Sequence, residues 1–411
     1  MYFWAETTII VRFWIVNGIF FLIALGLFFG DCVLFGNYLK YLIIVYFVTG
    51  KSVENYLNIL GADYLIHDDD DSELKKVENS KIFNKTYLDS IDEVIISPGL
   101  RPDHHLVQQF LDKKVPIKTD IDIFAMNYTG KVIGFTGTNG KTTFVSELVK
   151  FLNINGITSF SAGNIGVSPL EILENKYEYL VLELSSYQLH YTSILNLDLA
   201  VILNIFPDHI DWHQNIENYA NSKVKILSFL TNKKIDRKII GSNYGIIEKN
   251  LSDDPNLKNH NIKIHKELLS ALSETVKKIG GRVLYERFID YIKYNEMNYE
   301  HRMEQFLRVK GKNLTFINDS KATNYHAVSE GSKLFSGCDE EGILILHGIT
   351  KETVQNKLNI DPTFKHIIIP KGMNVNLGSH KADIIYIDDI YQLKKLLSSM
   401  ISSNQIVLFS C

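Results

Sequence analysis

Cysteine is scarce in this chain of 411 residues, which holds three: Cys32, Cys338 and Cys411. Their wide spacing provides neither a disulfide framework nor the paired cysteines of a zinc cluster, and it suits a reducing compartment. The sequence also lacks an excess of positive charge, because 43 basic and 47 acidic side chains leave a formal net charge of −4. That balance argues against electrostatic binding of nucleic acid, so we expect no nucleic-acid partner.

Charge is absent from residues 13–30, an apolar segment rich in Phe, Ile and Leu between Arg12 and Asp31. A run of this length is about the minimum for a membrane-spanning helix, so we predict a membrane-competent helix; a buried core helix is the alternative. A signal peptide fits less well, because Glu6 precedes the run and no small-residue cleavage site follows it. The remaining composition is that of a globular protein long enough for two or three domains.

The central feature of the chain is a glycine-rich turn, GFTGTNGKTT, at residues 134–143. Apolar residues precede it and a helical pattern follows it, which predicts strand, turn and helix. Backbone N–H groups of such a turn bind phosphate, Lys141 adds positive charge, and the Thr142 hydroxyl can ligate Mg²⁺. The strict phosphate-loop spacing would place glycine where this chain has Phe135. We predict a variant nucleotide-phosphate site; an ordinary strand–helix turn is the alternative.

From about residue 41 short apolar runs alternate with helical segments, which predicts an α/β fold with mostly parallel sheets. Ligands of such folds sit at the carboxyl ends of strands. Glu183 and His209 follow successive predicted strands, so together with Thr142 they could form a Mg²⁺ site beside a triphosphate; a single Glu or His would more often be structural. The acidic run 68–71 also follows a strand and is either a ribose contact or a solvated loop.

Three motifs resemble those of the Mur ligases of peptidoglycan synthesis: the loop at 136–143, the Ala-Gly-Asn-Ile-Gly turn at 162–166, and Pro207-Asp208-His209. Three further stretches resemble the D-glutamate-adding branch of that family: LELSSYQL at 182–189, HRME at 301–304 and NDSKATN at 318–324. The resemblance covers residues 41–411. It implies a ligase that uses ATP and Mg²⁺ as cofactors and joins UDP-N-acetylmuramoyl-L-alanine to D-glutamate through an acyl phosphate.

The resemblance also implies roles for individual residues. The ATP site would contain Gly137, Thr138, Asn139, Gly140, Lys141, Thr142, Thr143, Asn261, Arg302 and Asp319. The metal ligands would be Thr142 and Glu183 for one Mg²⁺, with His209 and a carbamylated Lys223 at the second. The substrates would contact Asn164, Ser185, Thr323 and Lys351, and the catalytic groups would be Lys141, His209, Lys223 and Lys321. Spacing alone indicates that Lys223 is a solvated surface lysine.

We expect three domains besides the N-terminal helix at 1–30: a Rossmann-like UDP-substrate domain at 31–129, a central ATP-binding domain at 130–302, and a truncated Rossmann-like domain at 303–411. The family's sequence continues past its last strand with a Ser and a Phe that hold D-glutamate, whereas this chain stops at Cys411. No helix is encoded after the predicted strand 406–409, so we expect an exposed apolar face and an exposed sheet edge there.

Other segments also depart from the family pattern. The turn at 49–52 lacks most glycines of the family's uridine-phosphate turn. Residues 4–15 resemble the end of phospho-N-acetylmuramoyl-pentapeptide transferase, so residues 1–30 are interpreted as its remnant fused to the ligase. Two alternatives stay open: a decayed remnant that binds ATP without catalysis, and a glutamate-adding ligase of the folylpolyglutamate synthase type. We expect a cytoplasmic monomer with a membrane tether at residues 13–30.

Overall fold

The computed structural model describes residues 39–164, 166–231, 238–240, 266–294, 303–309, 311–348 and 357–410. The predicted membrane helix and the transferase remnant lie outside these residues, as do Asn261, Arg302 and Lys351. None of the helices in the described ranges has both the length and the apolar character that crossing a bilayer requires. Two compact units are present. The first holds the described residues up to Gly130 with 162–176 and 187–196, and the second holds the others.

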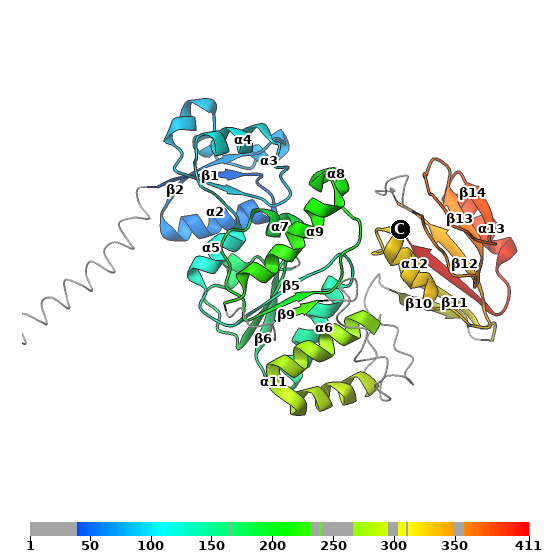
Figure 1. Ribbon diagram of the computed structural model, residues 1–411. Helices are drawn as coiled ribbons and strands as arrows, with labels where there is room; N and C mark the ends of the chain where they lie inside the picture. Colours follow the sequence, from blue (N-terminus) through cyan, green and yellow to red (C-terminus); the bar gives the residue numbers. More distant parts are fainter. Residues whose placement is uncertain are drawn as a thin grey trace, which may run out of the picture. The chain divides into compact units, whose positions relative to one another are not determined.

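The first unit is built around a four-stranded parallel sheet with the order β2-β1-β3-β4. Its strands are β1 (Lys40–Ile44), β2 (Asp63–His67), β3 (Glu93–Ile96) and β4 (Ile117–Lys118). Its helices are α2 (Val48–Leu60), α3 (Asp71–Leu74), α4 (His105–Asp112) and α5 (Asp120–Asn127), with α2 and α4 on either side of the strands (Figure 1). Strands covered on both faces are apolar along their whole length, which explains the nearly continuous Leu, Ile and Val of β1 and β3.

The second sheet has five strands in the order β6-β7-β5-β8-β9. They are β5 (Val132–Thr136), β6 (Ser159–Gly163), β7 (Tyr179–Glu183), β8 (Leu199–Ile202) and β9 (Lys238–Ile240). Its helices are α6 (Lys141–Ile154), α8 (Ile210–His213), α9 (Ile216–Val224) and α11 (Lys266–Tyr294). Helix α7 (Ser186–Tyr191) follows β7, but all of it except Ser186 belongs to the first unit. One apolar core joins β5 and β8 to α6 and α11. Because β5 is the central strand, the loop that follows it is held on both sides by neighbouring strands.

The third sheet has six strands in the order β10-β11-β15-β12-β13-β14, with β10 antiparallel to β11 and the other pairs parallel. The strands are β10 (Glu304–Val309), β11 (Leu314–Asp319), β12 (Glu341–Leu346), β13 (Phe364–Pro370), β14 (Asp383–Ile387) and β15 (Gln405–Ser410). Helices α12 (Tyr325–Lys333) and α13 (Ile390–Met400) complete it. The predicted α/β class with mostly parallel sheets is confirmed.

The expectation that the last strand leaves an exposed sheet edge is wrong. Strand β15 lies between β11 and β12, and residues 405–408 are buried. Val407 packs with Leu393 of α13, so the chain's own helix covers part of that face. The physical reason is the parallel crossover, which returns β15 to the middle of the sheet. The sequence shows that a strand exists but not the position it takes among its neighbours.

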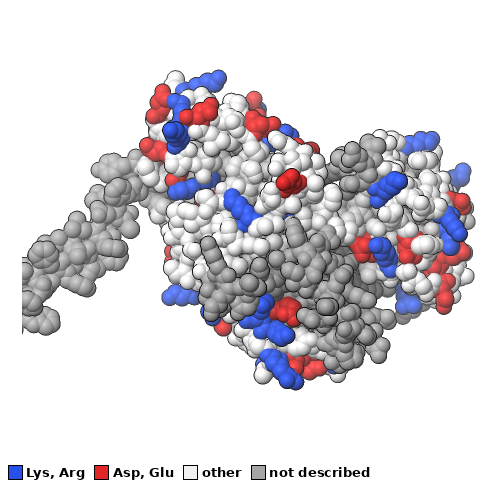
Figure 2. Space-filling model, in the orientation of Figure 1, with Lys and Arg blue, Asp and Glu red and all other residues white. Residues whose placement is uncertain are grey.

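Charged side chains of both signs are interspersed on the face shown in Figure 2, where basic and acidic groups alternate over short distances. Oppositely charged side chains also form pairs at the surface, such as Lys371 with Asp388 at 2.7 Å. Exposed pairs of this kind contribute little to stability, about 0–1 kcal/mol each. The stability of the fold therefore comes mainly from the apolar cores of the sheets.

Candidate functional site

The phosphate loop, residues 137–143, joins β5 to α6, as the strand–turn–helix pattern predicts. Gly140 immediately precedes α6 with a φ of +81°, in the left-handed region where glycine is favoured. A Cβ on Gly137 would lie 3.1 Å from Leu203 Cβ, and one on Gly140 would lie 2.8 Å from Leu203 Cδ2. The two glycines therefore permit a backbone conformation and a close approach that larger residues would strain.

Asn204, the second residue after β8, holds the phosphate loop. Its Oδ1 accepts hydrogen bonds from Thr138 N at 3.0 Å and from Asn139 N at 2.9 Å. Its backbone oxygen accepts from Thr138 N as well, at 3.0 Å. Asn204 was not among the predicted site residues, because its only signal in the sequence is a polar residue at the end of a buried strand. Asn204 fixes the loop in the conformation from which α6 begins.

The Thr138 hydroxyl connects the phosphate loop to helix α9. It lies 2.8 Å from the hydroxyl of Tyr219, and it accepts from Phe206 N at 3.0 Å. Tyr219 is almost fully buried and is on the same helix as Lys223. The hydroxyl network therefore positions α9, and with it Lys223, against the loop.

Phe135 occupies the position where the strict phosphate-loop spacing has glycine. Its ring is fully buried and stacks on Phe144 of α6, with ring centroids 4.0 Å apart and an angle of 8° between the planes. The side chain therefore contributes to the apolar core between β5 and α6. This explains how the loop keeps its conformation without the first glycine.

Lys141 is the first residue of α6, and its side chain curls back over the loop. Its Nζ donates to Gly137 O at 2.9 Å and to Thr138 O at 3.0 Å. These carbonyl oxygens stabilise the ammonium group next to the glycine-rich backbone. Positive charge and a helix N-terminus are thus combined at one place, which is the arrangement that binds phosphate.

The prediction from spacing that Lys223 is a solvated surface lysine is wrong, because only 2% of the residue is exposed. Its Nζ donates to Gly137 O at 2.9 Å and lies 4.9 Å from the centre of the Tyr219 ring. Burial lowers the pKa of Lys223 well below 10.5, and the positive charge of Lys141 lowers it further. The charges of Asp208 and Glu183 act in the opposite direction and raise this pKa. These interactions place Lys141, Lys223, Asp208 and Glu183 in one electrostatic cluster.

The metal-ligand candidates come from three neighbouring parts of the second unit. Glu183 ends β7 and is 1% exposed, while Thr142 is in the first turn of α6. His209 has a φ of +53° immediately before α8, and its backbone N donates to Asp208 Oδ1 at 2.9 Å. Hydroxyl and carboxylate oxygens are the ligands that Mg²⁺ prefers, so this donor set fits the ion. Among the described residues, no group of three His, Cys, Asp or Glu forms a metal cluster.

Asn164 and Ser185 lie in different units. Asn164 follows β6 in a turn that is closed by a hydrogen bond from Gly163 N to Val167 O at 3.2 Å. Ser185 lies between the end of β7 and the start of α7. Each residue therefore follows the carboxyl end of a strand, as expected for ligand contacts in α/β folds.

The loop from Asp319 to Asn324 follows β11 at the carboxyl end of that strand. Asp319 is buried, and its Oδ1 accepts from Met303 N at 3.2 Å. Asn324 caps α12 by accepting from Ala327 N at 2.9 Å. Lys321 and Thr323 are exposed between these two anchors. The loop thus presents Lys321 and Thr323 to solvent from a fixed backbone.

The acidic residues 68–70 after β2 interact with nearby backbone and side-chain groups. Asp68 Oδ2 accepts from Tyr46 N at 2.6 Å, and Asp70 caps α3 by accepting from Ser72 N at 2.8 Å. Asp69 lies 3.0 Å from His104 Nε2 and 3.3 Å from His67 Nε2, and both histidines lower the pKa of Asp69. Two of these carboxylates therefore stabilise the turns at the carboxyl ends of β1 and β2.

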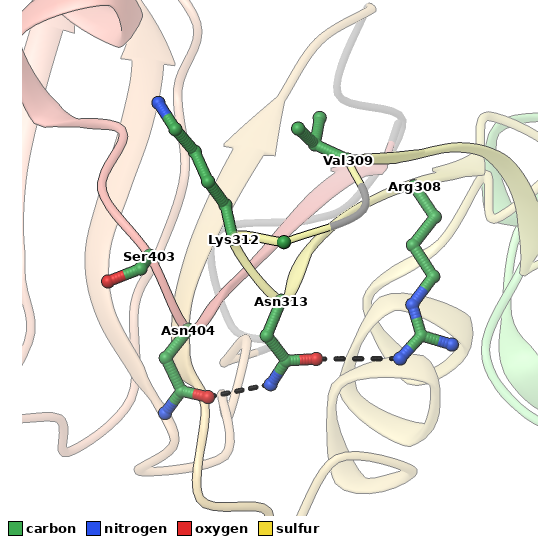
Figure 3. Close-up of a pocket in the computed structure, with 7 residues that line it drawn as sticks. Arg308, Val309, Lys312, Asn313, Ser403 and Asn404 are labelled. Atoms are coloured by element: carbon green, nitrogen blue, oxygen red, sulfur yellow. Dashed lines mark hydrogen bonds between the residues drawn. The ribbon is translucent and has the colours of Figure 1, made fainter.

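A cavity of about 580 Å³ lies at the amino ends of β11 and β15 (Figure 3). Arg308, Lys312 and Asn313 come from the β10–β11 hairpin, and Ser403 and Asn404 precede β15. Asn313 donates to Asn404 Oδ1 at 2.6 Å, which ties the two sides together. Because the loop with Asp319 is at the opposite, carboxyl ends of these strands, this cavity is separate from the candidate site.

Replacing Gly140 with alanine should weaken both the fold and nucleotide binding. A non-glycine residue in the left-handed region is disfavoured by about 1–2 kcal/mol, and the new Cβ would press on Leu203. We expect a loss of unfolding free energy of that size in chemical denaturation, with weaker ATP binding by calorimetry. Gly156→Ala is the matched control, since its φ is +78° but its Cβ would meet nothing within 4 Å. An unchanged ATP affinity in Gly140→Ala would contradict the proposed role of the loop.

The family model of the Mur ligase middle domain matches residues 135–316. A UDP-N-acetylmuramoylalanine–D-glutamate ligase of Thermotoga petrophila is 31% identical over 307 residues, which cover 68% of each chain. The chain belongs to the Mur ligase family. The predicted family and the predicted enzyme class, a ligase, are therefore confirmed.

Other relatives agree with this assignment to the Mur ligases. The ligase of the same name from Pseudothermotoga lettingae is 29% identical over 371 residues, or 80% of this chain and 82% of the relative. The solved structure of the MurF ligase from Thermotoga maritima, in complex with ADP, has a TM-score of 0.53 at 16% identity and covers 82% of this chain and 90% of its own. The UDP-N-acetylmuramate–alanine ligase MurC of the same organism has a TM-score of 0.51 at 14% identity, with 90% and 95% covered. At these identities the solved structures show the shared fold alone.

Proposed function

We propose that this Mur ligase adds D-glutamate to UDP-N-acetylmuramoyl-L-alanine at the expense of ATP. The observation that carries the proposal is the 31% identity to a ligase named for this reaction over two thirds of both chains. The NDSKATN loop after β11 and the LELSSYQL segment after β7 support the same branch of the family. The cluster of Lys141, Lys223 and Glu183 at the phosphate loop supports chemistry on a triphosphate.

The phosphate loop would hold ATP through its backbone and through Lys141. A glycine-rich turn followed by a helix N-terminus is a phosphate-binding arrangement, and residues 137–143 would surround the β- and γ-phosphates. Asp319 would contact the nucleotide, as would Asn261 and Arg302, which lie outside the described residues. Phosphoryl transfer needs positioning and charge neutralisation more than covalent help from the protein, which is what this arrangement supplies.

Two Mg²⁺ sites fit the donor groups. Thr142 and Glu183 would hold one ion, and His209 with Lys223 would hold the second. The Lys223 amine would first react with CO₂ to give a carbamate and a proton, which converts a buried amine into an oxygen ligand. Burial favours the neutral amine that this reaction requires. When bound, Mg²⁺ supplies neutralisation of the charge on the triphosphate.

The reaction itself has two steps. The γ-phosphoryl group of ATP is transferred to the free carboxylate of UDP-N-acetylmuramoyl-L-alanine, which gives an acyl phosphate and ADP. The amine of D-glutamate then attacks the acyl carbon, loses its proton, and expels phosphate as the amide bond forms. Asn164 and Ser185 would face the uridylated substrate, and Lys321 and Thr323 would reach the reacting groups and D-glutamate. Lys351, which lies outside the described residues, would be a further substrate contact.

We also propose the corresponding division into domains. Residues 31–129 would bind the uridylated substrate, residues 130–302 would bind ATP, and residues 303–411 would contribute to the nucleotide and D-glutamate sites. The carboxyl ends of β1 and β3, where ligands of such sheets bind, support this role for the first segment.

The test is turnover with defined substrates. Purified protein with ATP, Mg²⁺, UDP-N-acetylmuramoyl-L-alanine and radiolabelled D-glutamate should release ADP and form labelled product at about 1 s⁻¹ or faster. ADP release should require both other substrates, and L-glutamate or a folate acceptor should not replace them. ATP binding without any product would contradict the proposal and support a remnant that only binds nucleotide.

A further inference from the structure

Asp122 of α5 is a fully buried carboxylate that binds a chain segment 71 residues away. Its Oδ1 accepts from Ser193 N at 2.7 Å, from Ser193 Oγ at 3.0 Å and from Ile194 N at 2.8 Å. Its Oδ2 accepts from the backbone N and the hydroxyl of Thr119, both at 2.9 Å, and so starts α5. Hydrogen bonds to a charged acceptor are about twice as strong as neutral ones. Asp122 is therefore a strong attachment point between α5 and residues 193–194.

The segment that Asp122 holds directly follows helix α7. Thr192 Oγ1 donates to Gln188 O at 2.7 Å and closes the helix just before Ser193. Tyr191 provides a second attachment, because its hydroxyl donates to Leu100 O at 2.9 Å. Leu100 directly follows Ser97-Pro98-Gly99 at the carboxyl end of β3. Helix α7 is thus fixed to the edge of the first sheet at which a ligand of this fold would bind.

Helix α5 also packs against the 3₁₀ helix Pro169–Ile172. That helix begins at Ser168, whose side chain accepts from Leu170 N, and it follows the turn that carries Asn164. Helix α5 therefore supports two segments near the proposed substrate contacts. One is the 3₁₀ helix that follows the Asn164 turn, and the other is α7, which begins directly after Ser185.

We propose that Asp122 is a positioning residue for the uridylated substrate. By holding Ser193 and Ile194 it fixes α7 at the carboxyl edge of the first sheet, where a ligand of this fold would bind. No atom of Asp122 is required to touch the substrate. This inference rests on the proposed function, because that function supplies the substrate.

The test compares Asp122→Asn with Asp120→Asn. Both carboxylates are buried in the first turn of α5, but Asp120 Oδ1 accepts from Ile121 N of its own helix. Asp122→Asn should raise KM for UDP-N-acetylmuramoyl-L-alanine by about tenfold or more, the value expected for lost charged hydrogen bonds. KM for ATP and kcat should stay within about twofold, and Asp120→Asn should leave all three constants within about twofold.

A purely structural role predicts a different pattern. A less stable protein would have a lower midpoint of thermal unfolding and a smaller active fraction, so kcat would fall while both KM values stayed constant; that outcome overturns the inference. If Asp122→Asn does not fold, Ser193→Ala removes a hydroxyl that donates to Asp122, and Tyr191→Phe removes the hydroxyl of the second attachment of α7. Each should raise the same KM by about threefold, and an unchanged KM in both overturns the inference as well.

Calorimetry with UDP-N-acetylmuramoyl-L-alanine separates this inference from the proposed function. If the wild type binds this compound but forms no product, the proposed reaction is refuted. The Kd of the compound for Asp122→Asn, compared with that for the wild type, then tests Asp122: a raised Kd supports its role and an unchanged Kd overturns it. A wild type that ligates, combined with an unchanged Kd and KM in Asp122→Asn, overturns the role of Asp122 alone. A wild type that does not bind the compound contradicts both.

Discussion

Replacing Lys141 with alanine should lower kcat/KM for ATP by about 10²–10³-fold, the loss typical of removing one group that stabilises developing charge. The Lys141 ammonium is held by the carbonyl oxygens of Gly137 and Thr138. Its removal takes away the positive charge at the start of α6 without disturbing the core, so the effect should fall on catalysis and nucleotide affinity. The measurement is ADP release under saturating uridylated substrate, together with the Kd for ATP.

The matched control for Lys141 is Lys150→Ala. Lys150 lies on the same helix but is exposed and far along α6 from the phosphate loop. Its replacement should change kcat/KM for ATP by no more than about twofold, as expected for a surface substitution. If Lys141→Ala retained the activity of Lys150→Ala, the assignment of the phosphate loop as the ATP site would be refuted.

Replacing Lys223 with methionine should abolish ligation and leave the protein as stable as the wild type or more so. Methionine keeps the length of the side chain but has no amine to form a carbamate or to ligate a metal. The pKa of the buried amine lies well below 10.5, so between that pKa and 10.5 folding releases a proton that the unfolded chain binds. Gly137 O still accepts from Lys141 Nζ after the change. Turnover and thermal unfolding measured on the same samples test both halves of this prediction.

The contribution of Lys223 to stability can be measured from the pH dependence of the free energy of unfolding. At a pH between the pKa of Lys223 in the folded protein and 10.5, the unfolded chain binds one more proton at this residue than the folded chain does. The free energy of unfolding therefore rises with pH in this window. In buffers free of bicarbonate, the wild type should gain up to about 1.4 kcal/mol per pH unit relative to Lys223→Met in that window. A difference between the two proteins that is independent of pH would show that the Lys223 amine keeps its proton in the fold.

Carbamylation can be tested separately from charge. Wild-type protein depleted of CO₂ should lose activity and recover it when bicarbonate is added, because the carbamate forms reversibly. Lys223→Met should not respond to bicarbonate. Full activity of the wild type after thorough CO₂ removal would refute the carbamate while leaving the ATP site untouched.

Features that depend on residues adjacent in the chain could be predicted from the sequence. The phosphate loop joins β5 to α6 where the glycine-rich motif places it, because strand, turn and helix propensities act over neighbouring residues. The burial of Lys223 could not be predicted in this way. It depends on the packing of α9 against Gly137, 86 residues away, through Tyr219 and Thr138. Only the resemblance to the Mur ligases indicated that Lys223 has a role.

Asp122 and Asn204 were missed for the same reason. Asp122 resembles any acidic residue in the first turn of a helix, and its partners Ser193 and Ile194 come much later in the chain. Asn204 holds the phosphate loop from the neighbouring strand β8, and strand neighbours cannot be read from a single sequence. The order of strands in a sheet likewise results from tertiary packing, which is why the place of β15 differed from expectation.

The central place of β15 has a consequence for how the third sheet assembles. Leu314 of β11 pairs with Gln405 of β15, a sequence separation of 91 residues, and β15 also pairs with β12. The halves β10–β11 and β12–β14 therefore cannot join until β15 has been synthesised. Pairing over such separations is slow, and the apolar strand edges remain unpaired until it is complete. During translation this sheet should be the part of the protein most dependent on chaperones and the last to resist proteolysis.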